Sequence, residues 1–539
     1  MSTTFLLNLF VFSLILSFRV ATTDPILSCS QTPYPKVCTS LMSNISSQLS
    51  NQSQTPYPKV CTSLMSNISS QLSNQKAAAL NFRNLVIQAT MERVTLTHQL
   101  ALTMDQSSLD ERAKAALADC LVLYEDTISQ LNRSMDASSS HEDSQTWLSG
   151  AVANHETCKN GFVELDSSFH LPTTPFMTNN IFESLSNSLA INRAILMPIS
   201  SIGNRKLLSN GFPSWVSAAD RKLLQSSSVK ANIVVAQDGS GNYKTISEAV
   251  AASVKQSSGG SRFVIHVKAG TYDEKVQITT SMNNLMLIGD GAGVTVITGS
   301  KSVQDGTTFN SATVVVTGAG FIAKDITFEN TAGPKKQQAV ALLSRSDLSV
   351  VYRCSFKGYQ DTLCVYSQRQ FYRNCDIYGT VDFIFGDAVA VFQSCNMYLR
   401  KPLTGQENTV TAQGRSDPNE NTGISIQDCN IAAAENLGST RSYLGRPWKA
   451  YSRTVVMKTT IGGAIDPAGW LEWDGNSAPS TLYYGEYMNS GAGAGTGGRV
   501  KWPGYHVMSS SDANKFTVGN FLGGGSWIAS AGVPYTAGL

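Results

Sequence analysis

Two aspartates lie 21 residues apart in GYQDTLCVYSQRQFYRNCDIYGTVDFIFGD, the segment from Gly358 to Asp387. Asp361 follows a glutamine, and Asp382 lies in the otherwise apolar run VDFIF. Burying a carboxylate among such side chains costs free energy unless a charge or hydrogen bonds compensate it. The pair is therefore a candidate for chemistry, provided that the fold brings the two acids together.

Two neighbouring carboxylates have pKa values that are driven apart, so that one keeps a proton. This division suits an acid/base role for one and a nucleophilic role for the other. The amides of Gln338 and Gln360 can donate hydrogen bonds to a developing oxyanion. Arg446, in YLGRPWK, can keep one acid charged. Phe383, Phe385 and Trp448 offer aromatic faces for a sugar-binding groove.

A purely structural ladder of acids in β-turns is the alternative, but the glutamines, the arginine and the aromatic residues favour catalysis. The C-terminal half has two histidines, His266 and His506, and no Gly-x-Ser-x-Gly motif, which argues against a Ser-His-Asp hydrolase. Neither Cys-x-x-Cys nor His-Glu-x-x-His occurs, so we expect no metal and no cofactor.

From about residue 225 onward, short β-branched runs alternate with turn residues. One pattern recurs in FIAKDITFEN, VVYRCSFKG, FYRNCDIYG, VFQSCNMYL and ISIQDCNIA. Its equivalent positions are Ile326, Cys354, Cys375, Cys395 and Cys429. Coils of roughly 20 to 30 residues with strand-length apolar runs predict a right-handed parallel β-helix. The alternative, a β-sandwich, should show turn signals at intervals of roughly 8–12 residues.

The coil length decides where the two aspartates lie. Neighbouring parallel strands are ~4.8 Å apart, so residues one coil apart stack. The 21 residues between Asp361 and Asp382 match the step from Cys354 to Cys375. We therefore expect the two acids side by side on adjacent coils, with Gln338 one coil further along the same face.

Residues 24–200 are polar, serine-rich and helix-patterned, and the apolar spacing in 77–104 and 109–135 predicts an antiparallel helical bundle. One segment, Ser30–Gln52, is repeated without change as Ser53–Gln75. Repeats of a solenoid diverge and occur in threes or more. A recent duplication or an error of sequence assembly explains this copy better.

Residues 1–23 are interpreted as a signal peptide, because Phe5–Phe18 is apolar but shorter than a membrane span. An uncleaved anchor is the alternative. Ten cysteines and four glycosylation sequons also indicate a secreted, extracellular protein, the sequons being those of Asn44, Asn51, Asn67 and Asn132. A net charge of +2 does not suggest nucleic-acid binding.

A linker, 201–224, separates the helical half from a second domain, 225–539. It contains Arg-Lys-Leu-Leu twice, at 205–208 and 221–224, among Ser, Asn, Gly and Pro. Exposed basic pairs in an exported protein predict cleavage by a processing protease. Ordinary basic residues at helix ends are the alternative. We expect a monomer.

Residues 229–539 resemble the plant pectin methylesterases (pectinesterases). The resemblance is carried by GSGNYKTI, VKAGTYDEKV, QAVAL, GYQDTL, GTVDFIFG, YLGRPWK and DPAGWLEW, in that order. The N-terminal half resembles the inhibitor-like pro-region of the longer members, through CSQTPYPKVC, with Cys29 and Cys38, and the later pair Cys120 and Cys158. The Arg-Lys-Leu-Leu sites resemble the processing sites between the two parts.

This resemblance implies hydrolysis of galacturonate methyl esters in cell-wall pectin, with release of methanol and without a cofactor. Asp382 would be the nucleophile, and Asp361 the acid and later the base. The other implied roles are oxyanion stabilisation by Gln338 and Gln360, ionisation of Asp382 by Arg446, and substrate contacts by Thr308 and Trp448. The pro-region would hold the enzyme inactive until cleavage, and a separate inhibitor protein is a further expected partner.

Four residues depart from the family pattern and leave the pocket shape open. Cys364 and Tyr366 stand where Tyr and His are usual, and Leu343 and Arg345 where Arg and Gly are usual. The disulfides are also open. Cys29 has two candidate partners, Cys38 and Cys61, and a disulfide is expected in the ladder formed by Cys354, Cys375, Cys395 and Cys429.

Other functions were weighed against an esterase. A pectin lyase would need an acid cluster for Ca²⁺, and an inverting glycosidase needs carboxylates ~6.5–9.5 Å apart. One close pair with two glutamines fits neither. An enzyme weakened by the changes near Cys364, or a helical half that acts as an inhibitor or retention module, is the remaining alternative.

Overall fold

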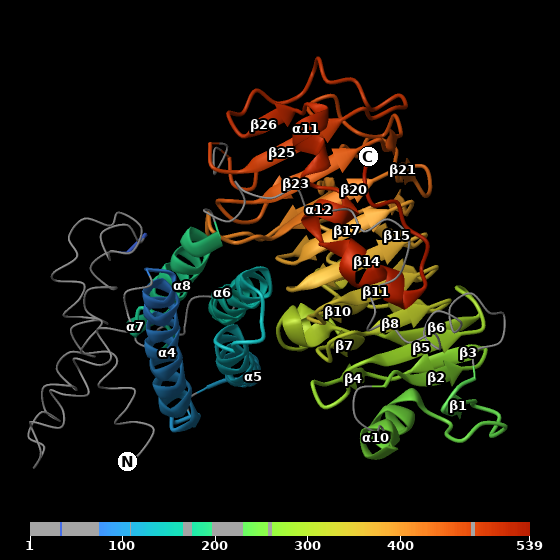
Figure 1. Ribbon diagram of the computed structural model, residues 1–539. Helices are drawn as coiled ribbons and strands as arrows, with labels where there is room; N and C mark the ends of the chain where they lie inside the picture. Colours follow the sequence, from blue (N-terminus) through green and yellow to red (C-terminus); the bar gives the residue numbers. More distant parts are fainter. Residues whose placement is uncertain are drawn as a thin grey trace, which may run out of the picture. The chain divides into compact units, whose positions relative to one another are not determined.

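A computed structural model describes residues 33–34, 75–107, 109–164, 175–196, 230–256, 261–475 and 480–539. They form two compact units, one helical and one built of strands (Figure 1). Several predictions lie outside the described residues: the signal peptide, the linker with its basic sites, the sequons of Asn44, Asn51 and Asn67, and the cysteines Cys29, Cys38 and Cys61. Within the described part, no helix has the length and apolar character needed to cross a membrane.

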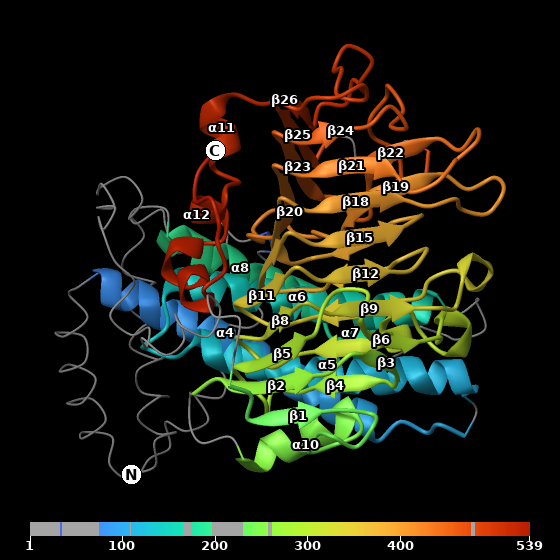
Figure 2. The same cartoon turned by 90° about the vertical axis from the view of Figure 1, so that its right-hand side faces the viewer.

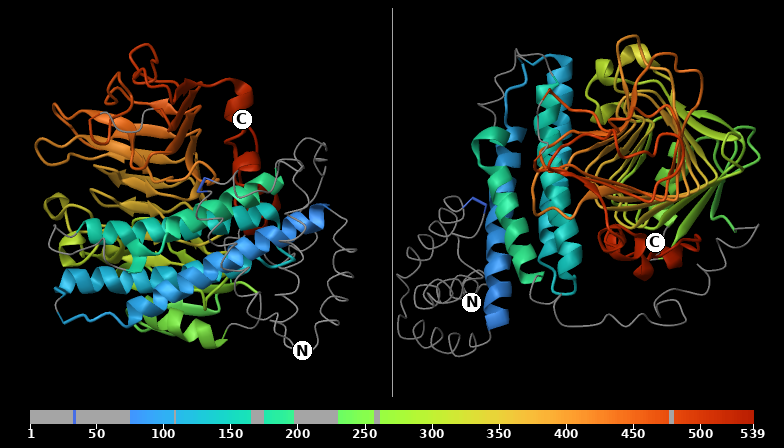
Figure 3. Two further views of the ribbon diagram at one scale, coloured as in Figure 1. Left: turned by 90° about the vertical axis from the view of Figure 1, so that its left-hand side faces the viewer. Right: turned by 90° about the horizontal axis from the view of Figure 1, so that it is seen from above.

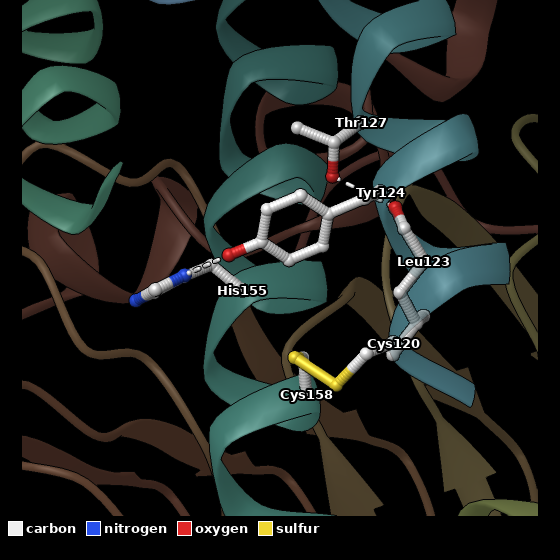
Figure 4. Close-up of a disulfide and its surroundings, with 6 residues drawn as sticks. All are labelled: Cys120, Leu123, Tyr124, Thr127, His155 and Cys158. Carbon is white, nitrogen blue, oxygen red and sulfur yellow. Dashed lines mark hydrogen bonds between the residues drawn. A yellow bond between two sulfur atoms is a disulfide. The ribbon is translucent and has the colours of Figure 1, made fainter. Parts of the chain in front are cut away.

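The helical unit is all α, as its pattern predicted. Its helices are α4 (Gln75–Leu102), α5 (Glu111–Ser134), α6 (His141–Val163), α7 (Pro175–Thr178) and α8 (Ile181–Leu196). A disulfide joins Cys120 of α5 to Cys158 of α6, and the Tyr124 hydroxyl lies 2.9 Å from Nδ1 of His155 nearby (Figure 4). The disulfide thus fixes α5 against α6.

Buried polar side chains tie the helices of this unit together. Arg83 of α4, 3% exposed, donates from Nε to Oδ1 of Asn192 at 2.6 Å. Asn192 of α8 in turn donates to Oε1 of Gln145 of α6, also at 2.6 Å. Burial lowers the pKa of Arg83 to about 10. A buried network of this kind is stable only while each member keeps its partners.

The second unit is a right-handed parallel β-helix of three sheets, in which every pair of strands is parallel (Figure 2). The 11-stranded sheet contains β1 (Ile233–Val235), β2 (Phe263–Val267), β5 (Leu285–Gly289), β8 (Ile322–Lys324), β11 (Ser349–Tyr352), β14 (Arg369–Arg373), β17 (Val389–Gln393), β20 (Gly423–Gln427), β23 (Arg453–Met457), β25 (Tyr483–Tyr487) and β26 (Tyr505–Val507).

The other two sheets complete each coil. The 8-stranded sheet contains β3 (Gly270–Asp273), β6 (Thr295–Gly299), β9 (Thr327–Asn330), β12 (Ser355–Lys357), β15 (Asp376–Gly379), β18 (Asn396–Leu399), β21 (Asn430–Ala433) and β24 (Thr460–Ile461). The 7-stranded sheet contains β4 (Val276–Ile278), β7 (Val314–Val316), β10 (Leu342–Ser344), β13 (Leu363–Val365), β16 (Ile384–Gly386), β19 (Asn408–Gln413) and β22 (Ser442–Pro447).

The predicted coil register is confirmed, and the β-sandwich alternative is wrong. Ser355 pairs with Thr327 and Asp376, so the residues before them, Ile326, Cys354 and Cys375, are equivalent. Viewed along the axis, the sheets surround one interior (Figure 3). Its apolar side chains form one continuous cluster, which includes Ile265, Leu287, Phe328, Phe356, Phe392 and Ile431.

The ends and one face of the β-helix are covered. The amphipathic helix α10 (Ile246–Gln256) lies at the N-terminal end and adds Ile246 and Val250 to the interior cluster. The C-terminal segment, with α11 (Ser510–Asn514) and α12 (Val518–Phe521), runs along the 11-stranded sheet. Val518, Leu522 and Trp527 pack there on outward-facing strand residues. This sheet is consequently apolar on both faces.

The coils turn at residues with left-handed backbone. One such residue directly follows successive strands of the 11-stranded sheet, with φ between 48° and 59°: Asp325, Arg353, Asn374, Ser394, Asp428, Lys458 and Met488. A second series precedes two strands of the 7-stranded sheet and contains Asp361 and Asp382. Asp and Asn enter this conformation more readily than other non-glycine residues.

The expected disulfide of the cysteine ladder is not formed. Cys354, Cys375, Cys395 and Cys429 are buried and their thiols are free. Instead, the backbone N–H groups of Cys375 and Cys395 point at the sulfur of the next cysteine, at 3.4 and 3.3 Å. Equivalent Cβ atoms on parallel strands stack ~4.8 Å apart, which exceeds the ~3.5–4.5 Å that a disulfide needs. Burial raises the pKa of the Cys354 thiol to about 12.

Candidate active site

Asp361 and Asp382 lie on neighbouring coils, as their spacing predicted. They precede β13 and β16, which pair through Leu363 and Ile384, so the two acids are in register. The backbone N–H of Asp361 donates to the carbonyl of Val381 at 3.0 Å. Their side chains are 7% and 5% exposed. Two acids are thus buried next to each other at the edge of an apolar interior.

The backbone at these positions favours aspartate. Asp361 has φ 63° and Asp382 has φ 52°, both in the left-handed region. The next residues, Thr362 and Phe383, are fully buried, and Phe383 belongs to the interior cluster. The prediction that Phe383 offers a face to a sugar-binding groove is therefore wrong, because its side chain points inward. The buried residues therefore fix the strand that follows each acid, and each acid lies at the turn before that strand.

Arg446 compensates the charge of Asp382. Its Nε and Nη2 donate to Oδ1 and Oδ2 of Asp382, at 2.8 and 2.7 Å. Burial opposes the charge of Arg446, but the hydrogen bonds and charge of Asp382, with a contribution from Asp361, raise its pKa above the ordinary value. Two parallel charge-assisted bonds fix both the charge and the orientation of the carboxylate.

Thr409 of β19 is a site residue that the sequence analysis missed. Its hydroxyl donates to Oδ1 of Asp382 at 2.6 Å and accepts from the backbone N–H of Asp382 at 2.8 Å. Asp382 is therefore held from two sides, by Arg446 and Thr409. Thr409 lies one coil after Asp382, so the coil length could have pointed to it. That coil, however, is longer than the coil from Asp361 to Asp382.

The two glutamines lie next to the acid pair. Gln360 precedes Asp361 and is half-buried, and its carbonyl accepts from the N–H of Ala339 at 3.2 Å. Gln338 is consequently on the preceding coil, as predicted. Its Oε1 is buried and makes no hydrogen bond within the described residues. Gln360 thus shares the coil of Asp361, and Gln338 lies on the coil before it.

Aromatic residues line the same outward face. Phe385 of β16 and Trp448, which follows β22, meet edge to face at 6.1 Å between ring centroids. Trp473, a second residue that the sequence analysis missed, lies 4.3 Å from the guanidinium of Arg446. Thr308, the predicted substrate contact, is 8% exposed and precedes Phe309 in another segment.

The four departures from the family pattern cluster beside Asp361. Leu343 pairs with Cys364, and Cys364 pairs with Phe385, across β10, β13 and β16. Tyr366 follows β13, and its N–H donates to Ser344 at 3.0 Å. Burial and the charge of Asp361 hold the pKa of the Cys364 thiol well above its usual value, against the charge of Arg345. Cys364 is therefore a neutral thiol.

A second buried pair of acids, Asp387 and Glu420, lies a few residues away. Asp387 follows β16 and accepts from Nε2 of Gln413 at 2.9 Å and from the hydroxyl of Thr422 at 2.6 Å. Burial raises its pKa to about 6, against a hydrogen bond from Glu420 and the charge of Arg415. Burial, together with Asp387, raises the pKa of Glu420 well above its usual value. Burial thus favours the protonated form in both members of this pair.

Comparison with known proteins gives the family. The family model "Pectinesterase" matches residues 232–525, and "Plant invertase/pectin methylesterase inhibitor" matches residues 48–191. The chain belongs to the pectinesterase family, a family of carboxylic ester hydrolases, and carries an N-terminal domain of the inhibitor family.

Individual relatives agree with this assignment. "Probable pectinesterase/pectinesterase inhibitor 17" of Arabidopsis thaliana is 51% identical over 95% of this chain and 94% of its own length. "Pectinesterase 2" of Citrus sinensis is 52% identical over 85% of this chain and 89% of its own. The structure of pectin methylesterase from carrot is 56% identical, with a TM-score of 0.57, and covers 58% of this chain and 100% of its own.

Proposed function

We propose that the β-helix unit hydrolyses the methyl esters of galacturonate units in pectin and releases methanol, with Asp382 as nucleophile. The observation that carries this proposal is the geometry of Asp382, whose carboxylate is held by Arg446 and Thr409 beside a second acid. A carboxylate that is fixed and charged can attack an ester carbonyl. The names of the relatives supply the substrate class.

In the first step, an oxygen of Asp382 forms a bond to the ester carbonyl carbon, and the carbonyl π electrons move to its oxygen. The amides of Gln338 and Gln360 donate hydrogen bonds to this oxyanion. The intermediate then expels the methoxy group, which takes a proton from Asp361 and leaves as methanol. The product of this step is an acyl-enzyme on Asp382.

In the second step, Asp361 is the base. It removes a proton from water as the water oxygen attacks the acyl carbon, and the bond to Asp382 breaks. The galacturonic acid unit leaves and gives its remaining proton to solvent, so that the product is a carboxylate, while Asp361 keeps the proton taken from water for the next cycle. The like charge of Asp382, fixed by Arg446, favours this return of the proton to Asp361. Thr308, Phe385 and Trp448 contact the polymer in this proposal.

The experiment is methanol release from highly methylated pectin by residues 225–539 and by their Asp382→Ala variant. Release by the first and none by the second is expected. Asp376→Asn is the matched control, since Asp376 lies on the same coil but bonds Asn396 outside the site. Unsaturated ends or new reducing ends without methanol would instead indicate a lyase or a glycosidase. No methanol from a folded wild-type fragment would contradict the proposal.

The helical unit is proposed to be an inhibitory pro-domain, removed at the Arg-Lys-Leu-Leu sites by a processing protease. Its match to the inhibitor family supports this role. The protein is proposed to be secreted to the cell wall as a monomer and to respond to separate inhibitor proteins as well. Asn132, exposed near the end of α5, is the glycosylation site proposed within the described residues. Full esterase activity of the uncleaved chain would contradict inhibition by the pro-domain.

A further inference from the structure

Arg345 is a buried cation that the steps above do not use. It follows β10 and is 5% exposed. The carbon of its guanidinium lies 5.3 Å from the ring centroid of Tyr366 and 5.9 Å from that of Phe309. These two rings meet edge to face at 5.7 Å. Because aromatic faces attract cations, the two rings hold the guanidinium in place.

The strand register places Arg345 on the outward face that carries the site. Leu342 and Leu363 are paired and point into the interior cluster, so their neighbours Leu343 and Cys364 point outward. Arg345, two residues after Leu343, lies on the same face. This face also carries Phe385, the partner of Cys364 on the next coil.

The charge of Arg345 reaches the region of Asp361. Both charges act on the thiol of Cys364, whose pKa Asp361 raises and Arg345 lowers. Cys364 lies between Asp361 and Tyr366 in the chain, and Arg345 contacts Tyr366. The opposite charges of Asp361 and Arg345 thus both act on one neutral residue, in a buried environment where screening by solvent is weak.

We propose that Arg345 is a second positioning cation of the site, which stabilises the ionised form of Asp361 as Arg446 stabilises that of Asp382. This inference rests on the proposed function. Other titratable or charged groups close to Asp361 are Asp382 on the next coil, Arg446 beyond it and the neutral Cys364. Asp382 favours the protonated form of Asp361, and Arg345 opposes it. The balance sets how readily Asp361 gives and regains its proton.

The sign of the effect follows from the first chemical step. Asp361 must be protonated to release methanol, so the rate falls as pH rises through the pKa of Asp361. Arg345 lowers that pKa and moves the alkaline limit of activity to lower pH. At an effective dielectric constant of about 20, which applies to buried sites in proteins, a charge roughly 10 Å away changes a pKa by about one unit.

The test is the pH profile of kcat for methanol release, measured with the full chain and with residues 225–539. Arg345→Gln should move the alkaline limb upward by about one pH unit. Arg345→Lys keeps the charge and should leave the limb near its wild-type position. Arg353→Gln is the matched control, because Arg353 pairs with Asp325 at an exposed corner of the same unit.

An alkaline limb that is unchanged in Arg345→Gln, with only a lower melting temperature, would overturn the inference and leave Arg345 a packing role. If Arg345→Gln does not fold, Arg345→Gly takes its place, since glycine is the residue expected there in the family. The same upward shift is then expected, and its absence overturns the inference. A wild-type protein that releases no methanol at any pH would instead overturn the proposed function, and this inference with it.

Discussion

The chain buries two pairs of acids on consecutive coils and holds them in different ways. In the first pair, Asp382 receives two hydrogen bonds from the guanidinium of Arg446. In the second pair, burial raises the pKa of both Asp387 and Glu420, and the neighbouring Arg415 donates to the backbone carbonyls of Glu420 and Tyr451. The first pair therefore contains a carboxylate held by an arginine, and the second contains two acids in which burial favours the protonated form.

The difference shows that the chemical role of a buried acid depends on its hydrogen-bond partners and not on residue type alone. Burial alone raises the pKa of a carboxyl group, as it does for Asp387. A guanidinium whose N–H groups point at the carboxylate makes charge-assisted hydrogen bonds to it, whereas one that bonds carbonyl groups acts on the acid only through its charge. The candidate nucleophile is the acid whose carboxylate oxygens accept from an arginine, and the structural acid lies beside an arginine that donates to backbone carbonyls.

The largest expected effect comes from replacing one acid of each pair by its amide. Asp382→Asn should lower kcat by at least about 10³-fold, because the amide oxygen is a poor nucleophile. Glu420→Gln should leave kcat within about twofold, since it lies outside the chemistry. Methanol release at saturating pectin measures both. Comparable losses of kcat in the two variants would contradict the different roles assigned to the two pairs.

Removing the guanidinium of Arg446 should have the next largest effect on kcat. Arg446→Met leaves Asp382 buried without its partner, so the acid takes up a proton and kcat falls by about 10²- to 10³-fold. Arg446→Lys should give an intermediate loss, because an ammonium cannot make the two parallel bonds. The measurement is kcat for methanol release by the wild type, Arg446→Met and Arg446→Lys. Full activity in Arg446→Met would show that Asp382 does not need the ion pair.

Stability should depend on pH through the second pair. Asp387 is protonated in the folded state up to about pH 6, but only to about pH 4 when unfolded. The folded state then binds more protons, so stability falls as pH rises from about 4 to about 6, by about 3 kcal/mol. Asp387→Asn should remove this contribution to the slope, and Glu435→Gln, an exposed control, should not. Urea unfolding of residues 225–539 across this range measures it, and an unchanged slope contradicts it.

The smallest expected effect is at Thr409. Thr409→Val keeps the shape of the side chain but removes the hydroxyl that bonds Asp382, and a hydrogen bond to a charged group contributes about 1.5 kcal/mol or more. We expect kcat to fall about tenfold. Thr411→Val is the matched control on the same strand, because Thr411 bonds the carbonyl of Leu444 instead. Equal effects of the two variants would place the loss in packing.

The features that repeat with the coil length could be predicted from the sequence. The equivalence of Ile326, Cys354 and Cys375 followed from a recurring pattern, and so did the adjacency of Asp361 and Asp382. These features depend on local alternation repeated at a nearly constant interval. They are therefore visible without knowledge of distant contacts.

Features set by irregular segments were not predicted. Glu420 lies in the loop between β19 and β20, where no period links it to Asp387, and Thr409 follows a lengthened coil. The free thiols were also missed, because sequence spacing shows that cysteines stack but not that their Cβ atoms stay too far apart to bond. Each of these depends on exact three-dimensional spacing.

The left-handed corners have a consequence for the evolution of this site. Asp325 and Asp428 occupy such corners far from the acid pair, which shows that the backbone accepts aspartate there for conformational reasons alone. Asp361 and Asp382 satisfy the same demand in addition to any chemistry. A gene copy released from selection for catalysis would still be selected for folding. Its descendants should therefore carry Asn or Gly at these two positions far more often than Ala or Val, and would retain the coil after losing the reaction.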